Sequence, residues 1–251
     1  MDKALQPSDA EAGAILEALR ANPAFLPVSE AERTAIEAFR RGVRGLGAGR
    51  TVIEEHRRSP WLFTLCQGWA FRYKTLSDGR RQILSFLLPG DFMGLQDEFV
   101  EGTSYGVEAA TDVILAAYPR EALWSFFREQ PRLGYAITWM VANEEKFVDD
   151  NLVTAGRRSA AERVAMLLLH LYRRAERVGM AAHGCVAFPF SQQHLADALG
   201  LSLVHTNKTL RKLQRMGLHR LEGGVLQILE PHALERLGDY FERPLRPTPL
   251  L

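Results

Sequence analysis

The first part of the chain repeats its apolar residues with the period of an α-helix. Apolar side chains recur every three or four positions between Ala12 and Leu19, which predicts a short amphipathic helix over residues 9–19. A second helix is predicted after Ser29, because Ser29 and Glu32 have the spacing of a capping box. The chain therefore opens with two short helices.

From about residue 44 the apolar period changes to two, the repeat of a β-strand. Trp61, Phe63 and Leu65 alternate with their neighbours, and Gly, Pro and Asp punctuate the region at short, regular intervals. This pattern predicts a small antiparallel sandwich or barrel. The other segments rich in strand-forming residues are 69–73, 82–88 and 112–118.

A long helix is predicted from Pro131 to about residue 155, because proline suits the first turn of a helix and the apolar stripe continues throughout. A compact sheet domain cannot cover so long a helix. Its apolar face therefore packs either against a second copy of the chain or against a second domain. We expect a homodimer, with polar Glu144 and Asn151 setting the register. The predicted dimer interface comprises Leu133, Ile137, Met140, Val141, Glu144, Phe147, Val148 and Asn151.

The segment after Ser191 has the spacing of a helix-turn-helix. Ser191 can cap a short helix, Gly200 supplies a tight turn, and Ser202 can cap a second helix. Ala196 is small at the point where the second helix must approach closely. Two strand-like stretches joined by glycines at 223–224 add the β-hairpin of a winged helix.

The second of these helices places polar and basic residues opposite its apolar ones. Short polar groups near its start can reach base edges in the major groove, and the later lysines and arginines can neutralise phosphates. Thr206 and Thr209 stand where aliphatic residues are commoner. The alternative is a helical hairpin that serves only for packing. The predicted DNA-binding residues are Ser191, Gln192, Ser202, Val204, His205, Asn207, Lys208, Arg211 and Lys212.

The distribution of charge favours DNA binding over packing alone. The 251 residues have a formal net charge of +1, which hides an asymmetry between the two parts of the chain. Residues 1–156 contain 17 basic and 22 acidic side chains, whereas residues 157–220 contain 11 basic and 3 acidic ones. An acidic first part joined to a basic second part indicates that only the second meets a polyanion.

The turn motifs at 76–79 and 88–94, followed by the long helix and by residues 191–229, resemble the Crp/Fnr family of bacterial transcription regulators along nearly the whole chain. The resemblance implies an α+β fold, with a jelly-roll-like antiparallel β-roll of the cyclic-nucleotide-binding type, a dimerisation helix and a C-terminal winged helix-turn-helix. It also implies a homodimer on a two-fold symmetric double-stranded DNA site, with RNA polymerase as a further partner.

We expect three domains that follow this order and a hinge near residues 156–159. We also expect a cytoplasmic protein without membrane contact, because neither a signal pattern nor a long apolar run is present. The Pro-rich end of the chain predicts a flexible tail. The expected divisions are 1–130 for the β-roll domain, 131–156 for the dimerisation helix, 157–242 for the DNA-binding domain and 243–251 for the tail.

Members of that family that respond to cyclic nucleotides carry a Glu directly after a Gly-Asp-x-x-Gly turn and an Arg-Ser or Arg-Thr pair further on. Here Leu95 follows that turn, and no arginine occurs between Arg81 and Arg120. A buried phosphate without a cationic or multiply hydrogen-bonded partner is costly. We therefore expect that cyclic AMP does not bind in that way and that the effector, if any, is another compound. The effector-pocket candidates are Leu95, Thr103 and Ser104.

The chain contains two cysteines, too few for a typical four-thiolate iron–sulfur cluster. No cofactor and no metal site is indicated. Cys66 alternates with core residues and is expected to be a small buried hydrophobe. Cys185 lies just before the DNA-reading motif and is the candidate redox site, because its oxidation there could weaken DNA binding.

Two enzyme interpretations compete with DNA binding. A cupin-like metal enzyme needs two or three histidines in its barrel, whereas residues 1–156 contain only His56. Residues 102–106 match the hydrolase nucleophile pattern, but the residues that follow predict a strand where that motif requires a helix. We therefore expect no enzyme and no catalytic residue. The remaining alternative is an effector-binding or scaffold β-roll protein without DNA binding.

Overall fold

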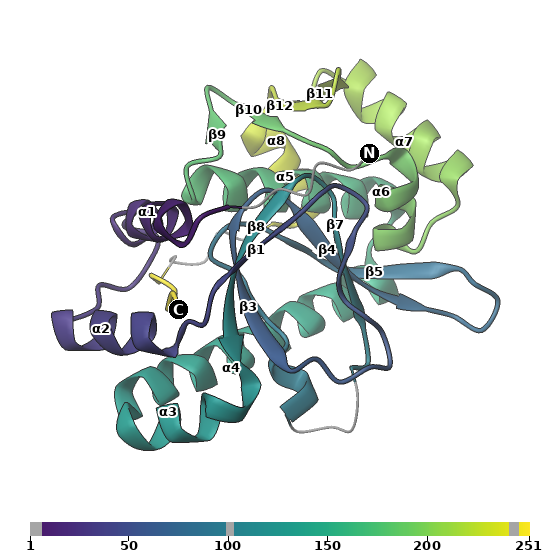
Figure 1. Ribbon diagram of the computed structural model, residues 1–251. Helices are drawn as coiled ribbons and strands as arrows, with labels where there is room; N and C mark the ends of the chain where they lie inside the picture. Colours follow the sequence, from purple (N-terminus) through teal and green to yellow (C-terminus); the bar gives the residue numbers. More distant parts are fainter. Residues whose placement is uncertain (1–6, 99–102, 241–245) are drawn as a thin grey trace. The chain divides into compact units, whose positions relative to one another are not determined.

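The computed structural model describes residues 7–98, 103–240 and 246–251, apart from the side chains of Asp97, Glu98, Lys146 and Phe147 (Figure 1). These residues form two compact units. The first comprises the described parts of Met1–Lys74, Phe86–Lys146 and Arg246–Leu251, and the second those of Thr75–Ser85 and Phe147–Leu245. This division differs from the predicted boundaries at 131 and 156, because the long helix is shared between the units and is no separate domain.

Strands of the predicted sandwich or roll form two four-stranded sheets, in the orders β1-β8-β3-β6 and β2-β7-β4-β5. The pairs β1–β8, β3–β8 and β4–β7 are antiparallel, as expected. The strands are β1 (Val43–Leu46), β2 (Thr51–Ile53), β3 (Trp61–Gln67), β4 (Ala70–Thr75), β5 (Arg81–Leu87), β6 (Phe92–Met93), β7 (Gly106–Ala109) and β8 (Val113–Pro119).

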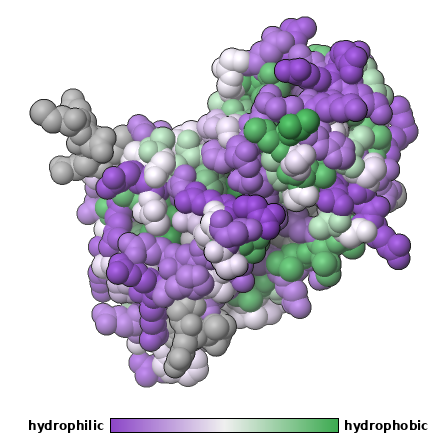
Figure 2. Space-filling view, turned by 90° about the vertical axis from the view of Figure 1, so that its right-hand side faces the viewer, coloured by the Kyte–Doolittle hydropathy of each residue, from purple (hydrophilic) through white to green (hydrophobic). Residues whose placement is uncertain are grey.

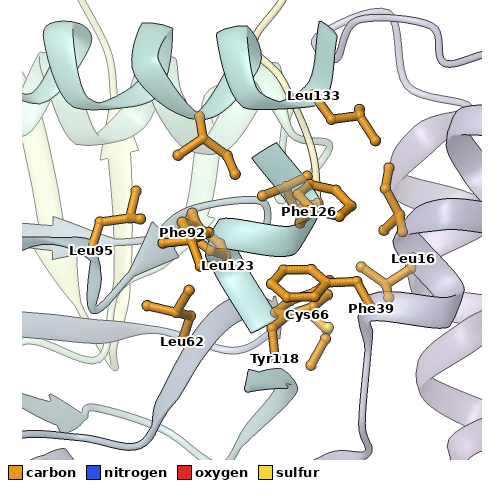
Figure 3. Close-up of a cluster of buried hydrophobic side chains, with 14 of the residues drawn as sticks. Leu16, Phe39, Leu62, Cys66, Phe92, Leu95, Tyr118, Leu123, Phe126 and Leu133 are labelled. Carbon is orange, nitrogen blue, oxygen red and sulfur yellow. The ribbon is translucent and has the colours of Figure 1, made fainter. Parts of the chain in front are cut away.

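Helices cover the outer face of the first sheet, so β3 and β8 are buried on both faces. The alternating pattern identifies Phe63 and Leu65, yet Leu62 and Cys66 on the other face are also buried. Figure 3 shows Leu62 and Cys66 within a cluster to which the helices add Leu16, Phe39, Phe126 and Leu133. The helices and short 3-10 turns of this unit are α1 (Asp9–Arg20), α2 (Glu30–Phe39), η1 (Leu95–Glu98), η2 (Arg120–Ala122), α3 (Leu123–Glu129) and the start of α4 (Pro131–Arg157).

The first helices begin where the capping residues place them. The predicted capping box of α2 is present, since the Glu32 amide donates to Ser29 Oγ at 3.2 Å and the Ser29 amide donates to Glu32 Oε2 at 2.8 Å. Ser8 caps α1 in the same manner, by accepting from the Glu11 amide at 3.1 Å. These local bonds fix the starts of two helices whose apolar faces complete the core of the first unit.

The second unit is a helical domain with a small sheet. Its central helix α5 packs against α7 and α8, and α6 packs against α7. The break between helices comes slightly later than predicted, because Gly156 is still part of α4 and the chain turns at Arg158 and Ser159. Its elements are α5 (Ala160–Arg177), β9 (Ala181–Ala182), β10 (Cys185–Ala187), α6 (Gln192–Leu199), α7 (Leu203–Arg215), β11 (His219–Glu222), β12 (Val225–Ile228) and α8 (Pro231–Gly238).

Residues 246–251 are packed, which contradicts the predicted flexible tail. They belong to the first unit, where Leu250 and Leu251 are only 2% and 1% exposed. Burial of two leucines removes apolar surface from water and holds the segment in place. The start of the predicted tail, residues 243–245, lies outside the described residues.

Apolar side chains are not confined to the core. Figure 2 shows hydrophobic residues exposed among hydrophilic ones on the face turned to the viewer. Trp124, Tyr135 and Leu152 are each more than two thirds exposed. None of the helices in the described ranges is long and apolar enough to cross a lipid bilayer.

Candidate nucleic-acid interface

The helix-turn-helix is built by three local devices that the sequence predicted. Ser191 accepts a hydrogen bond from the His194 amide at 3.2 Å, which starts α6. Gly200 ends α6 with a left-handed φ of 63°, which glycine adopts without steric cost. Ser202 then accepts from the His205 amide at 3.2 Å and starts α7. These caps set the path of the chain from α6 into α7.

The buried face of α7 fixes which residues face solvent. Leu210 and Leu213 are buried against the rest of the unit, together with Thr206 and Thr209. The Thr209 hydroxyl donates to the His205 carbonyl at 2.8 Å, so this polar group is satisfied within the helix. The Thr206 hydroxyl, by contrast, is buried and has no hydrogen-bond partner among the described residues. The opposite face carries a shallow hollow lined by Val204, Asn207, Lys208, Arg211, Gln214 and Arg215.

Most predicted DNA-binding residues lie at the surface. Val204 is 78% exposed, and Asn207 is the exception because it is half-buried and its Oδ1 is shielded from solvent. Gln214 and Arg215 also line the hollow, although they were not among the predicted contacts. Their helical spacing from Arg211 is the sequence signal that could have identified them. The exposed predicted residues are Ser191, Gln192, Ser202, Val204, His205, Lys208, Arg211 and Lys212.

The basic residues of α7 differ from the arginines of the first unit in that they form no ion pair with a described carboxylate. In the described part of the chain, no carboxylate lies within 4.0 Å of a basic nitrogen of Lys208, Arg211, Lys212 or Arg215, whereas arginines in the first unit commonly form ion pairs. Unpaired cations on one exposed helix face produce a local positive potential that attracts a polyanion.

A short hairpin follows α7, as predicted for the wing. Strands β11 and β12 pair antiparallel, with Glu222 opposite Val225. Gly223 and Gly224 join them with φ values of 59° and 74°, the conformation of a tight hairpin turn that other residues adopt poorly. The Gln214 side-chain Nε2 donates to Glu222 Oε1 at 3.3 Å and links the end of α7 to the wing.

A buried histidine lies at the base of the wing. His219 has no exposed surface, and neither ring nitrogen has a hydrogen-bond partner among the described residues. Burial penalises the charged imidazolium and lowers the pKa of His219 to about 4. His170 of α5 is affected by the same cause, and its pKa falls to about 3.

These two histidines predict a loss of stability on mild acidification. Their folded-state pKa lies below the unfolded value, so the stabilisation is complete above about pH 6.5 and is lost as the pH falls toward 4. His219 alone lowers the free energy of unfolding by at most about 3 kcal/mol over this pH range. Urea unfolding followed by circular dichroism at several pH values measures it. His219→Leu should flatten the pH dependence, and His205→Leu on the exposed face of α7 should not; equal profiles for both variants would contradict this assignment.

The effector-pocket candidates occupy different environments. Leu95 is part of the apolar core, and Thr103 is buried with its hydroxyl oxygen 2.6 Å from the carbonyl oxygens of both Glu54 and Arg57, to one of which it donates its hydrogen. Ser104 is exposed. The hydroxyl of Thr103 is therefore engaged in holding its own loop.

Two arginines that the sequence patterns did not single out organise the roll. The buried Arg120 guanidinium donates to the carbonyls of Ser59 at 2.7 Å and Gly94 at 2.5 Å, which fixes the turn before Leu95. Arg72 of β4 forms an ion pair with Glu144 of α4 at 3.2 Å. These bonds join segments far apart in sequence, so no local pattern indicates them.

The predicted dimer residues divide into two groups. Leu133 and Ile137 are buried in the core of their own chain, with Met140 packed against it, and Glu144 pairs with Arg72. Leu133 and Ile137 are therefore unavailable to the expected seam, because residues of the same chain already cover them. Half-buried Met140 and Glu144 stay predictions. Phe147 lies outside the described side chains. The exposed group contains Val141, Val148 and Asn151, whose Nδ2 donates to the Leu84 carbonyl at 3.0 Å.

Both cysteines are free thiols. Cys66 is buried in the core, as expected, and burial raises the pKa of its thiol to about 11. Cys185 is half-buried on β10, opposite Gln227 of the wing strand β12. The redox candidate therefore lies in the small sheet of the second unit.

Comparison with known proteins identifies both parts of the chain. Residues 43–130 match the cyclic nucleotide-binding domain, and residues 162–237 match the Crp-like helix-turn-helix domain. The nitrogen fixation regulation protein FixK of Bradyrhizobium diazoefficiens is 32% identical over 88% of this chain and 92% of its own length. The transcriptional activator protein FnrL of Cereibacter sphaeroides is 30% identical over 78% of this chain and 80% of its own.

A solved structure has a similar fold. FixK2 from Bradyrhizobium japonicum superposes with a TM-score of 0.71 at 28% sequence identity, and the match covers 78% of this chain and 96% of FixK2. A match of that length extends into both units of this chain.

Proposed function

Because this chain belongs to the Crp/Fnr family of transcription regulators, we propose that it acts as a homodimer on a two-fold symmetric DNA site. Each subunit places its α7 in the major groove, and the two grooves lie about 34 Å apart. Val204 and Lys208 contact base edges, whereas Arg211 and Lys212 contact phosphates. Ser191, Gln192 and Ser202 approach the backbone with the N-termini of α6 and α7.

The observation that carries this proposal is the row of unpaired cations on the exposed face of α7. Lys208, Arg211 and Lys212 have no carboxylate partner among the described residues, although 30 acidic residues occur in the chain. Binding of DNA would neutralise these charges and release counterions from the duplex. A scaffold without DNA binding gives no physical reason for this arrangement.

Two alanine variants test the division between base and phosphate contacts. Lys208→Ala should lose discrimination between the specific site and other duplexes by about 1–3 kcal/mol. Arg211→Ala should weaken binding to all sequences and lower the salt dependence by about one unit per subunit. Fluorescence anisotropy over a range of salt concentrations measures both. Arg57→Ala, on the surface of the first unit, is the control, and equal effects of the first two variants on every sequence would refute the division.

The dimer is proposed to form along the exposed apolar row of α4. Val141, Val148 and Leu152 are 40%, 62% and 71% exposed, and their spacing places them along one side of the helix. An exposed apolar row of this kind marks a site of association. The two subunits would then meet through the later part of α4, and RNA polymerase would contact the DNA-bound dimer.

We further propose that the chain does not respond to cyclic AMP in the usual manner. Leu95 belongs to the core, and the Arg120 guanidinium is directed to the carbonyls of Ser59 and Gly94. Isothermal titration with cyclic AMP should therefore give no saturable heat up to millimolar nucleotide. Micromolar affinity would overturn this part of the proposal and leave DNA binding untouched.

A further inference from the structure

The strap, residues Arg246–Leu251, follows the DNA-binding domain in sequence but belongs to the first unit. Leu250 and Leu251 are almost completely buried, and Leu251 is part of the core cluster that contains Leu16 and Phe39. The strap is therefore a component of the first unit's core.

Main-chain hydrogen bonds align the strap beside the loop that joins α1 and α2. The Leu26 amide donates to the Thr248 carbonyl and the Thr248 amide donates to the Ala24 carbonyl, each at 2.9 Å. This is the parallel pairing by which an extended peptide adds to a strand edge. The buried Thr64 hydroxyl donates to the main-chain oxygen of Leu251 at 2.9 Å. The backbone of the strap is thus bonded at Thr248 and at Leu251.

An apolar groove of about 370 Å³ runs along this docking site. Its walls come from the loop before α2, from the start of α4 and from the strap itself, through Pro249, Leu250 and Leu251. Prolines restrict the strap to extended conformations, which lowers the entropy lost on docking. Besides the strap, the groove is lined chiefly by Leu26, Pro27, Val28, Leu133, Ala136 and Trp139.

We propose that the first unit contains a binding site for an extended Thr-Pro-Leu-Leu segment, which the chain's own strap occupies. The strap is consequently a second tether of the DNA-binding domain. Along the sequence, the described residues 147–240 are connected to the first unit twice. On one side α4 connects them to it, and on the other side the strap is docked in it. Closing this loop restricts the orientations that the winged helix samples, and release of the strap widens them.

Hydrogen exchange in the full-length protein tests the docking site without reference to DNA binding. The amides of Leu26 and Thr248 should be protected, and Leu250→Asp should increase the exchange of both at least about tenfold while α7 amides keep their rates. Pro247→Ala alters an exposed residue of the same segment and should leave both amides protected. Unprotected Leu26 and Thr248 amides in the parent protein would overturn the proposal.

A peptide of residues 246–251 provides a second measurement if Leu250→Asp unfolds the protein. Added to a chain that ends at residue 245, the labelled peptide should bind saturably, and a peptide with Leu250→Asp should bind at least about 30-fold more weakly. Equal binding of the two peptides would refute a specific site. If the shortened chain is unfolded alone, the parent peptide should restore its fold and the substituted peptide should not.

Spin labels test the tether itself. With Cys66→Ala and Cys185→Ser as background, labels at Ala38→Cys and Met216→Cys report the distance between the two units. Leu250→Asp should broaden that distribution, and Pro247→Ala should not. An unchanged width with Leu250→Asp would overturn the tether. Dimers mixed from differently labelled subunits show whether the strap docks on its own chain. A strap label that lies near the first unit of the partner subunit only would overturn the assignment of the strap to its own chain.

Discussion

Leu152→Asp together with Val148→Asp is expected to convert the protein into a monomer and to lower its affinity for a two-fold symmetric DNA site by at least about 100-fold. The two side chains are 71% and 62% exposed on α4 and make no contribution to the core of their own chain. Introduced carboxylates would lie in the proposed seam, where burial of an unpaired charge is costly. A monomer binds one half-site and loses the gain from simultaneous contact with two.

Light scattering measures the change from dimer to monomer, and a gel shift on the two-fold symmetric DNA site measures the loss of affinity. Ala142→Asp introduces the same charge on the same helix but outside the row formed by Val148 and Leu152, so it should leave both properties unchanged. Thermal unfolding should show that the double variant keeps its fold, because both positions are exposed. A double variant that stays dimeric, or a monomer that binds the symmetric site with full affinity, would refute the proposed seam.

The dimer row also illustrates what the periodicity of α4 could and could not predict. The repeat identified the helix, which extends over Pro131–Arg157. It did not distinguish residues covered by the same chain from residues left open, because both groups are apolar. Leu133 and Ile137 share a core cluster with residues of α1, α2, β3 and β8, elements that are distant in sequence, as well as with the neighbouring α3. That distinction depends on tertiary packing, which a one-dimensional pattern does not contain.

Features that depend on neighbouring residues were predicted more successfully. The caps at Ser29, Ser191 and Ser202 and the turn at Gly200 all form within a few residues of the chain. The winged helix-turn-helix was confirmed for the same reason, and the α+β fold with its antiparallel sheets was confirmed as the family resemblance implied. Within the candidate interface, the exposed face of α7 was predicted from its helical period.

Long-range polar contacts could not be predicted. The ion pair of Arg72 with Glu144 joins residues 72 positions apart, and the strap is bonded to Thr64 across 187 positions. Composition was misleading for the strap, because a segment rich in proline usually lacks the apolar surface needed for packing. Leu250 and Leu251 supply that surface here, and Leu251 packs into the core cluster to which α1, α2, α3 and α4 contribute.

The turn between β3 and β4 is where a single methyl group should have the largest effect on stability. Gly68 has a φ of +91°, and an added Cβ would fall on the main-chain oxygen of Asp112 and 2.7 Å from the Thr111 hydroxyl oxygen. That hydroxyl also accepts a hydrogen bond from the Trp69 amide at 2.9 Å. The backbone at the start of β8 would have to move, and the buried Trp69 would move with it.

Gly68→Ala should therefore reduce the free energy of unfolding by at least about 3 kcal/mol, through both backbone strain and the steric clash. Gly49→Ala is the matched control in the same unit, because Gly49 has a φ of +76° but a Cβ added there would meet no atom within 4 Å. It should cost about 1 kcal/mol for the left-handed conformation alone. Urea unfolding followed by tryptophan fluorescence reports on this unit, which contains all four tryptophans of the chain. Since the two variants share the conformational cost, the difference between them measures the clash with Asp112 and Thr111. Equal destabilisation by both substitutions would mean that the turn relaxes freely and that this close approach does not constrain the roll.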